Sequence, residues 1–247
     1  MKNKEILLLS ETGKTFLVKD PKKDFHCQFG KIDAKDLKKK GIIFSNTGHQ
    51  FTVLEAFFID KYDRMKRAPQ IITKKDLGLI IAETGIGKSS VILDAGVGSG
   101  ASTFMFANIC KKVIGYEIRK DFLEVAEKNL NFLGLKNVTL KNKDIYQGIE
   151  EKNLDLINLD LSEPWLAIKA IKDSKDVLKI GSFIVCYTPT VPQVMDFISE
   201  IKQHKEFNIL KTVELIAREW EVQDRKVRPK TSQLNHTGFL VFVRKIA

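Results

Sequence analysis

The spacing of apolar and polar residues divides the chain into two regions. Up to about residue 60, short apolar runs are separated by glycine and proline, which predicts the β-strands of a small domain. From Leu77 onward, apolar runs alternate with amphipathic segments, which predicts strands alternating with helices. The expected strands are 6–9, 16–18, 42–44 and 51–54 in the first region and 91–97, 112–118, 138–144, 155–161 and 182–188 in the second. We therefore expect a small β-domain over residues 1–66 and a larger domain over residues 67–247.

The larger domain has the pattern of an α/β fold. Helices are expected between its strands, for example over residues 121–132, where apolar residues recur at helical spacing. Strands that alternate with helices form a mostly parallel sheet with helices on both faces. After a helix around 191–204, two β-rich stretches follow at 209–222 and 237–245 with no helix between them. We expect these two stretches to pair as an antiparallel hairpin at the edge of the sheet.

The excess of positive charge lies in the two flanking segments of the chain. The formal net charge is +10, from 41 Lys and Arg against 31 Asp and Glu. Residues 1–67 hold 15 basic and 9 acidic side chains, residues 68–215 hold 19 of each, and residues 216–247 hold 7 and 3. Basic charge confined to two segments indicates a surface for a polyanion, with nucleic acid the first candidate. Solvated loops without a partner remain the alternative.

The sequence does not favour a secreted, membrane-bound or metal-dependent protein. No apolar run approaches the roughly 18 residues that a membrane span needs, and the run Ile6–Leu9 is too short for a signal peptide. The cysteines are far apart and form no CxxC pair, and the histidines are scattered. We therefore expect a cytoplasmic protein with reduced thiols, no metal site and no Ser-His-Asp constellation. The cysteines are Cys27, Cys110 and Cys186, and the histidines are His26, His49, His204 and His236.

A glycine-rich turn follows the first strand of the larger domain. It reads Asp94-Ala-Gly96-Val-Gly98-Ser-Gly100 and opens the next helix. Glycines permit a tight turn and let a ligand lie against bare backbone, at a helix N-terminus that carries partial positive charge. The same turn also satisfies the permissive dinucleotide-binding fingerprint.

Three carboxylates favour S-adenosylmethionine as the ligand of this turn, and the first is Asp94, which opens the turn. Glu117 ends the second strand, where it is placed to bind ribose hydroxyls, and Asp144 ends the third, where it can meet an adenine amino group. The C-terminal antiparallel hairpin is usual in class I methyltransferases and foreign to a nicotinamide-binding domain. Each carboxylate taken alone has the alternative of a strand-end cap. Gly85–Ser89 resembles a phosphate-binding loop, but Ala82 stands where that motif needs glycine, and we expect a surface turn there.

A second candidate site lies at the end of the fourth strand, in the sequence Asn158-Leu-Asp160-Leu-Ser-Glu-Pro-Trp165. Ligands of open α/β sheets bind beyond the carboxyl ends of the strands, so Asp160 is aimed at the same crevice as the glycine turn. Its carboxylate can accept a hydrogen bond from an exocyclic amine. Capping of the following helix is the alternative role for Asp160. Tyr187 ends the fifth strand and is placed either to stack on a base or to fill the core.

These segments resemble the tRNA (adenine-58-N1)-methyltransferases of the bacterial and archaeal homotetrameric type, almost from end to end. The most specific stretches are LDLSEPW at 159–165 and the HTGFL sequence that begins at His236. Further similarity lies in 25–32, in Gly48 to Phe51, in 66–76, in 218–222 and in 228–245. Two departures are Thr73, where the family often has tyrosine, and Cys27, where it has threonine. The first departure puts one base-stacking contact in doubt.

The resemblance implies a small N-terminal β-domain, a class I S-adenosylmethionine-dependent catalytic domain and a homotetramer. The implied reaction is methyl transfer to N1 of adenine 58 in the T-loop of tRNA, and the sequence leaves open whether adenine 57 is modified as well. Asp160 would hold the target adenine and border the cofactor, with Tyr187 beside it. The other residues implied at the cofactor site are Gln70, Asp94, Gly96, Gly98, Ser99, Gly100, Ala101, Ser102, Glu117 and Asp144.

The sequence leaves two alternatives open. A methyltransferase that acts on a protein or a small molecule would share the cofactor residues but would have no use for the basic flanks. A catalytically inactive tRNA-binding subunit, as in heteromeric relatives, typically loses the glycine turn and the aspartate after strand four. Both features are present here, which favours an active enzyme.

Overall fold

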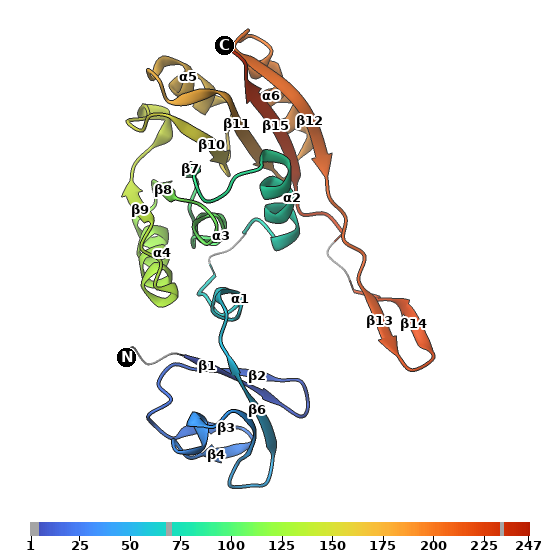
Figure 1. Cartoon of the computed structure of the whole chain (residues 1–247). Coiled ribbons are helices and arrows are strands. Elements are labelled where there is room, and N and C mark those ends of the chain that lie inside the picture. Colours follow the sequence, from blue (N-terminus) through green and yellow to red (C-terminus); the bar gives the residue numbers. More distant parts are fainter. Residues whose placement is uncertain (1–4, 68–70, 233–234) are drawn as a thin grey trace. The chain divides into compact units, whose positions relative to one another are not determined.

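The computed structural model describes residues 5–67, 71–232 and 235–247. The chain divides into two compact units, Met1–Met65 and Lys66–Ala247. Figure 1 shows both units, with most of their helices and strands labelled.

The smaller unit is built on a four-stranded antiparallel sheet with the strand order β2-β1-β6-β5. Its elements are β1 (Ile6–Ser10), β2 (Thr15–Val18), β3 (Phe25–Cys27), β4 (Gly30–Ile32), the 3-10 turn η1 (Asp36–Lys38), β5 (Gly41–Phe44), β6 (Gln50–Glu55) and α1 (Phe58–Tyr62). Leu8, Val18, Ile43 and Phe51 form its core together with Ile32 and Leu37. The four expected strands are confirmed as β1, β2, β5 and β6. The β3–β4 hairpin was not predicted, because its strands have three residues each and too few apolar positions.

The larger unit contains a seven-stranded sheet with the order β12-β15-β11-β10-β7-β8-β9. The strands from β11 to β9 are parallel, and β15 is antiparallel to both β11 and β12. The strands are β7 (Val91–Ala95), β8 (Lys112–Glu117), β9 (Val138–Asn142), β10 (Leu154–Leu159), β11 (Leu178–Thr188), β12 (Phe207–Glu214) and β15 (Phe239–Lys245). The helices are α2 (Lys74–Thr84), α3 (Ala101–Ala107), α4 (Lys120–Leu133), α5 (Leu166–Asp173) and α6 (Val191–Ile201), with a 3-10 turn η2 (Ile145–Gln147). The predicted mostly parallel α/β sheet is confirmed.

Alternating residues of each strand contribute to two separate cores, one on each face of the sheet. Leu93 and Val241 pack with Ile168 of α5 and Phe197 of α6 on one face. On the other face, Ile92, Leu156 and Phe242 pack with Leu77 of α2 and Phe106 of α3. Burial on both faces explains why the central strands are mostly apolar rather than alternating regularly between apolar and polar residues.

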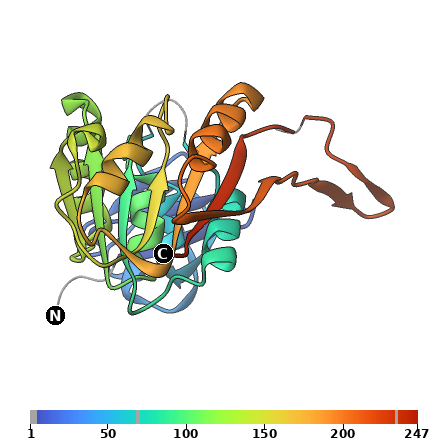
Figure 2. The same cartoon turned by 90° about the horizontal axis from the view of Figure 1, so that it is seen from above.

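The C-terminal part corrects one prediction. The expected pairing of the last two β-rich stretches is present, because β12 and β15 are antiparallel neighbours. The first stretch does not continue to residue 222, however, but ends at Glu214. Trp220–Gln223 (β13) instead pairs with Lys226–Pro229 (β14) in a hairpin of its own. Its apolar side chains are exposed, so burial does not keep this segment in the main sheet. The hairpin extends away from that sheet in both views (Figures 1 and 2).

The remaining expectations concern cysteines and membranes. Cys27, Cys110 and Cys186 are free thiols. Among the residues that the structure describes, none of the helices has the length and hydropathy needed to cross a membrane. Gly85, in the sequence that resembles a phosphate-binding loop, ends α2 in the left-handed conformation, as expected for a turn.

Candidate active site

The glycine turn connects β7 to α3 and is shaped by close contacts with its neighbours. Gly96 has φ +92°, and an ideal Cβ on it would lie 1.9 Å from the backbone oxygen of Asp160. Gly100 has φ +91°, and its Cβ would lie 2.0 Å from the ring of Phe104. A residue with a side chain would be strained at either position and would also collide with its neighbour. The glycines therefore let the end of β10 and the first turn of α3 pack directly against the loop.

Asp94 lies behind the loop and ties it to its surroundings. The side chain is fully buried. Its carboxylate accepts hydrogen bonds from Ser102 Oγ (2.7 Å), Thr103 Oγ1 (2.5 Å) and Asn158 Nδ2 (2.7 Å). Burial raises the pKa of Asp94, and these three donors oppose that shift. Through these hydrogen bonds, the Asp94 side chain of β7 holds the start of α3 and the end of β10 in place.

A first cavity of about 480 Å³ opens at the carboxyl ends of β7, β8, β9 and β10. At one side, Glu117 accepts hydrogen bonds from the backbone N–H of Gly98 (2.8 Å) and of Arg119 (2.9 Å). At another, Asp144 accepts from the N–H of Tyr146 through Oδ1 (2.9 Å). Among the described residues, no hydrogen bond is made by Asp144 Oδ2. This oxygen is available to a ligand that carries a donor.

The predicted cofactor residues fall into two groups. Those that line the first cavity are Gly96, Gly98, Glu117, Asp144 and Asp160. Those that lie outside its lining are Asp94, Ser99, Gly100, Ala101 and Ser102. Ser99 and Ser102 are both buried. Gln70 lies outside the described residues.

Several residues that line the first cavity were not predicted. Phe122 was recognised only as part of the apolar face of α4, because its position on that face gives no sign that it borders a cavity. The Arg119 guanidinium lies 3.7 Å from the centre of the Phe122 ring and is paired with Asp121 at 2.7 Å. The further lining residues are Ala95, Tyr116, Ile118, Lys143, Ile145, Tyr146, Leu161 and Ser162.

Asn129 is another residue that the sequence reasoning missed. It is buried on α4, and its Nδ2 donates to the carbonyl oxygens of Ser99 (2.9 Å) and Lys66 (2.8 Å). Its Oδ1 accepts from the N–H of Lys66 at 3.0 Å. Asn129 therefore joins the glycine turn to the segment before α2. A polar residue among the apolar positions 122, 125, 126, 130 and 133 was the available signal.

A second cavity, of about 350 Å³, shares Asp160, Leu161 and Ser162 with the first. Its other lining residues are Ile71, Tyr187, Pro189 and Gln193. Asp160 follows β10 directly and is held there by its backbone N–H, which donates to the carbonyl of Ala95 at 2.9 Å. Asp160 thus borders both cavities.

The carboxylate of Asp160 is electrostatically unusual. Burial raises its pKa to about 7, and the negative charges of Asp94 and Glu117 add to this shift. Within the described part of the chain, no hydrogen bond or ion pair is made by this carboxylate. The alternative role as a helix cap does not hold, because α5 is preceded by Trp165 at its N-cap and has no side-chain cap hydrogen bond. A raised pKa at a cavity wall is typical of a functional carboxylate.

Tyr187 forms part of the wall of the second cavity. The ring is mostly buried, and burial raises the pKa of Tyr187 to about 12, so the phenol is neutral. Its hydroxyl donates to the carbonyl oxygen of Thr237. A Cβ on Gly238 would lie 2.6 Å from the Tyr187 ring, so the glycine makes room for the tyrosine. The ring contributes to the core and to the cavity wall at once.

Comparison with known proteins identifies the family. The sequence profile of the family described as "tRNA methyltransferase complex GCD14 subunit" matches residues 64–237. A protein from Methanocaldococcus jannaschii is named tRNA (adenine(57)-N(1)/adenine(58)-N(1))-methyltransferase TrmI. It is 34% identical to this chain over an alignment of 267 positions, which covers 96% of this chain and 94% of that protein. This chain belongs to the tRNA methyltransferase family. The resemblance stated from the sequence is confirmed.

Two solved structures are similar to this member of the tRNA methyltransferase family over its whole length. An S-adenosylmethionine-dependent O-methyltransferase from Thermotoga maritima has a TM-score of 0.85 and 31% identity, covering 100% of this chain and 94% of that one. The tRNA (m1A58) methyltransferase TrmI from Aquifex aeolicus has a TM-score of 0.78 and 26% identity, covering 99% and 98%. The predicted class I methyltransferase fold is confirmed, and the protein is an S-adenosylmethionine-dependent methyltransferase.

The first cavity fits S-adenosylmethionine. Its volume lies within the range of roughly 300–1,000 Å³ that is usual for small-molecule sites. Three carboxylates, Glu117, Asp144 and Asp160, border it beside apolar side chains, which suits a ligand with hydroxyls, an amino group and a positive sulfur. Among the described residues, no group of three or more His, Cys, Asp or Glu side chains could hold a metal ion.

Proposed function

We propose that this protein transfers the methyl group of S-adenosylmethionine to N1 of adenine 58 in the T-loop of tRNA. The observation that carries this proposal is the position of Asp160 between the two cavities. The cofactor would occupy the first cavity, and the target adenine would enter the second. Methyl transfer would then take place beside Asp160.

The first cavity offers a separate contact for each part of the cofactor. Glu117, already fixed by two backbone N–H groups, would accept from the ribose hydroxyls through its remaining lone pairs. Asp144 would accept from the adenine amino group through Oδ2. The glycine turn would let the cofactor approach the backbone. When bound, S-adenosylmethionine supplies an activated methyl group on a positively charged sulfur.

The second cavity supplies the contacts to the target base. Asp160 would accept a hydrogen bond from the N6 amino group of adenine and so orient N1, with Tyr187 in the wall of the same cavity. Methylation at N1 leaves positive charge on the base, and the ionised Asp160 carboxylate would stabilise this charge as it develops. The contacts that orient N1 would also align it with the methyl donor. Alignment of reacting atoms can lower the activation barrier by roughly 7–11 kcal/mol.

The basic flanks suit a tRNA substrate. N1 lies on the Watson–Crick edge and is buried in a folded T-loop, so the adenine must be flipped out of its stack, at a cost of a few kcal/mol. Lys and Arg side chains of residues 1–67 and 216–247 carry the whole net charge of +10. Their contacts with the phosphate backbone would offset part of that cost.

The test is to incubate the protein with labelled S-adenosylmethionine and an unmodified tRNA transcript and to map the modified base. We expect label at N1 of adenine 58, and the same map shows whether adenine 57 is modified. Transcripts with guanine at position 58 serve as the control. Absence of label from tRNA, with cofactor binding intact by calorimetry, would contradict the proposal.

An oxygen acceptor is the second candidate, because the Thermotoga maritima structure is named an O-methyltransferase. An oxygen nucleophile has to lose a proton, and a carboxylate with a pKa of about 7 is suited to accept one. The basic flanks favour the tRNA substrate instead. Label recovered on an alcohol or phenol, and none on tRNA, would identify this alternative.

We also infer a cytoplasmic homotetramer. Reduced cysteines suit the cytoplasm. Exposed apolar side chains on the β13–β14 hairpin support association between copies, since Trp220, Val222 and Val227 are 52%, 71% and 57% exposed. Light scattering after gel filtration measures the mass directly. A mass of one chain would contradict the tetramer.

A further inference from the structure

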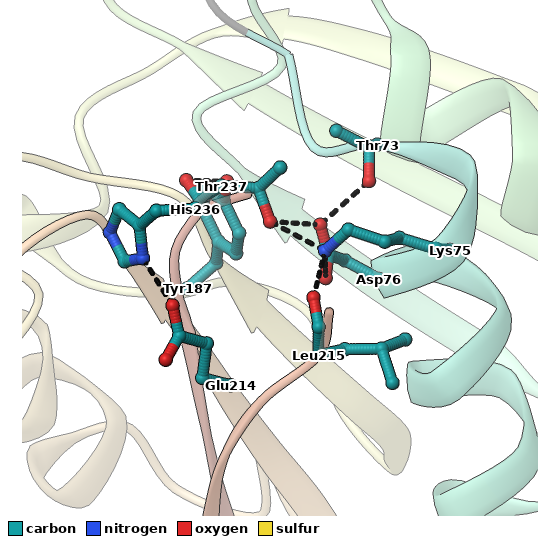
Figure 3. A network of polar contacts seen from close by, with 8 residues as sticks. All are labelled: Thr73, Lys75, Asp76, Tyr187, Glu214, Leu215, His236 and Thr237. Carbon is teal, nitrogen blue, oxygen red and sulfur yellow. Dashed lines mark hydrogen bonds and ion pairs between the residues drawn. The ribbon is translucent and has the colours of Figure 1, made fainter. Parts of the chain in front are cut away.

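A buried carboxylate lies outside both cavities, at the start of α2. Asp76 is fully buried. Its Oδ2 accepts hydrogen bonds from Thr73 Oγ1 (2.7 Å) and Thr237 Oγ1 (2.9 Å), and its Oδ1 accepts from Lys75 Nζ (2.8 Å). Figure 3 shows that these contacts bring α2 together with the segment before β15. Residues more than 160 positions apart in the chain are therefore joined at one carboxylate.

Lys75 completes this network. Its ammonium group also donates to the carbonyl of Leu215 (2.5 Å) and to Thr237 Oγ1 (2.7 Å). An ammonium group has three donors, and Asp76, Leu215 and Thr237 use all three. The Thr237 hydroxyl accepts from Lys75 while it donates to Asp76, so its hydrogen-bonding capacity is used in both directions. The network holds the backbone near Thr237 in one place.

The segment 236–238 is in direct contact with the wall of the second cavity. The Tyr187 hydroxyl donates to the Thr237 carbonyl, and Gly238 packs against the Tyr187 ring. His236 Nε2 lies 2.8 Å from the carbonyl oxygen of Pro189, and His236 Nδ1 lies 2.6 Å from Glu214 Oε1. Tyr187 and Pro189 both line the second cavity. Figure 3 shows Tyr187 between His236 and the Asp76 network.

Stability alone gives a weak reason for such a network. Taking a charged pair out of water has a desolvation cost that often cancels its attraction, and well-packed apolar residues would serve as well. Buried and fully hydrogen-bonded networks instead restrict the local structure to one arrangement. Here the arrangement that they restrict includes the tyrosine beside the target base.

We infer that Asp76 is a positioning residue, which acts through Thr237 to fix Tyr187 in the wall that receives the target adenine. This inference rests on the proposed function. Asp76 touches neither cavity, so its effect has to pass through the Thr237 backbone and the Tyr187 hydroxyl. A shift of the ring would misplace the base relative to the methyl donor.

Two isosteric substitutions separate positioning from stability. Thr237→Val and Thr73→Val each remove one hydroxyl that donates to the same Asp76 oxygen, but only Thr237 is bonded to Tyr187. We expect Thr237→Val to lower kcat for tRNA methylation about tenfold, since small misplacements at a reacting centre have effects of this size or larger. The KM for tRNA and the affinity for the cofactor should stay within about twofold, and Thr73→Val should keep the parental kcat. Thr237→Ser, which keeps the hydroxyl, should restore most of the kcat.

A double-mutant cycle with Tyr187→Phe tests the path. If Thr237 acts through Tyr187, the double variant should have about the same kcat as the poorer single variant. Multiplicative losses in the double variant would overturn the inference, as would equal losses of kcat in Thr237→Val and Thr73→Val. Melting temperatures of all variants show whether each loss of kcat follows loss of stability instead. A parent enzyme that does not methylate tRNA would refute the proposed function, whereas an active parent with a normal Thr237→Val variant refutes only the role of Asp76.

Discussion

A methyl group on Gly96 would overlap the backbone oxygen of Asp160, because the ideal Cβ position lies only 1.9 Å from that atom. The glycine turn after β7 and the end of β10 are therefore in direct backbone contact. The residue that would hold the target base is positioned by the loop that would hold the cofactor.

Gly96→Ala should disturb both sites at once. The variant would combine a collision with an unfavourable φ of +92°, and we expect a loss of roughly 2–4 kcal/mol in the free energy of unfolding. Cofactor affinity should fall with it. Gly98→Ala is the matched control for the collision, because its φ is also positive, at +54°, but its Cβ would meet open space. Denaturant unfolding of both variants measures the difference, and equal losses would argue against the backbone contact.

Loss of Asp160 should reduce turnover rather than tRNA binding. Asp160→Ala should lower kcat by roughly 10²–10³, the scale of one preorganised electrostatic contact at a transition state. Affinity for tRNA, spread over many phosphates, should change little. Asp160→Asn keeps the shape but removes the charge, so it should be nearly as slow as Ala if the charge matters. Glu163→Gln in the same segment should methylate at the parental rate. Single-turnover methylation at saturating cofactor is the measurement, and a fast Asp160→Ala enzyme would refute the assignment.

The raised pKa of Asp160 predicts a pH-dependent effect on stability. The pKa rises from 3.8 to about 7 on folding, so the native state binds this proton more tightly than the unfolded state does. The contribution of Asp160 to the free energy of unfolding is fully present below pH 3.8 and is lost as the pH rises through about 7. The Asp160→Asn side chain stays neutral, so the free energy of unfolding of this variant should rise relative to that of the parent as the pH increases over this range. The difference should be at most about 4 kcal/mol, and less where solvent reaches the carboxylate. Melting temperatures from pH 4.5 to 8 test this, and a constant difference would contradict it.

Glu117 should matter for the cofactor and not for tRNA. Removal of a carboxylate that forms charged hydrogen bonds typically costs about 1.5–3 kcal/mol, so Glu117→Ala should weaken cofactor binding roughly tenfold to a hundredfold. Asp121→Ala is the control, because Asp121 pairs with Arg119 on the surface and does not line the first cavity. Calorimetry with S-adenosylmethionine and a filter-binding assay with tRNA separate the two affinities. Unchanged cofactor affinity in Glu117→Ala would remove Glu117 from the site.

Much of the fold followed from local patterns in the sequence. The strands of the larger unit were predictable because two-sided burial makes them apolar and glycine turns or polar residues end them. Glu117, Asp144 and Asp160 were located in the same way, since the carboxyl ends of parallel strands meet at one edge. The inward position of Asp94 was not predictable, because it depends on donors from α3 and β10. The same holds for Thr237, whose partners lie far away in the chain.

The position of β15 between β11 and β12 has a consequence during translation. This strand is made after every other strand of its sheet, and the contact of Thr237 with Tyr187 forms only when the segment before β15 has left the ribosome. Until then β11 lacks its antiparallel neighbour and β12 cannot join the sheet. A nascent chain can therefore complete its glycine turn well before it can complete the wall of the second cavity. We expect ribosome-bound chains that stop before residue 237 to be unable to hold the target adenine.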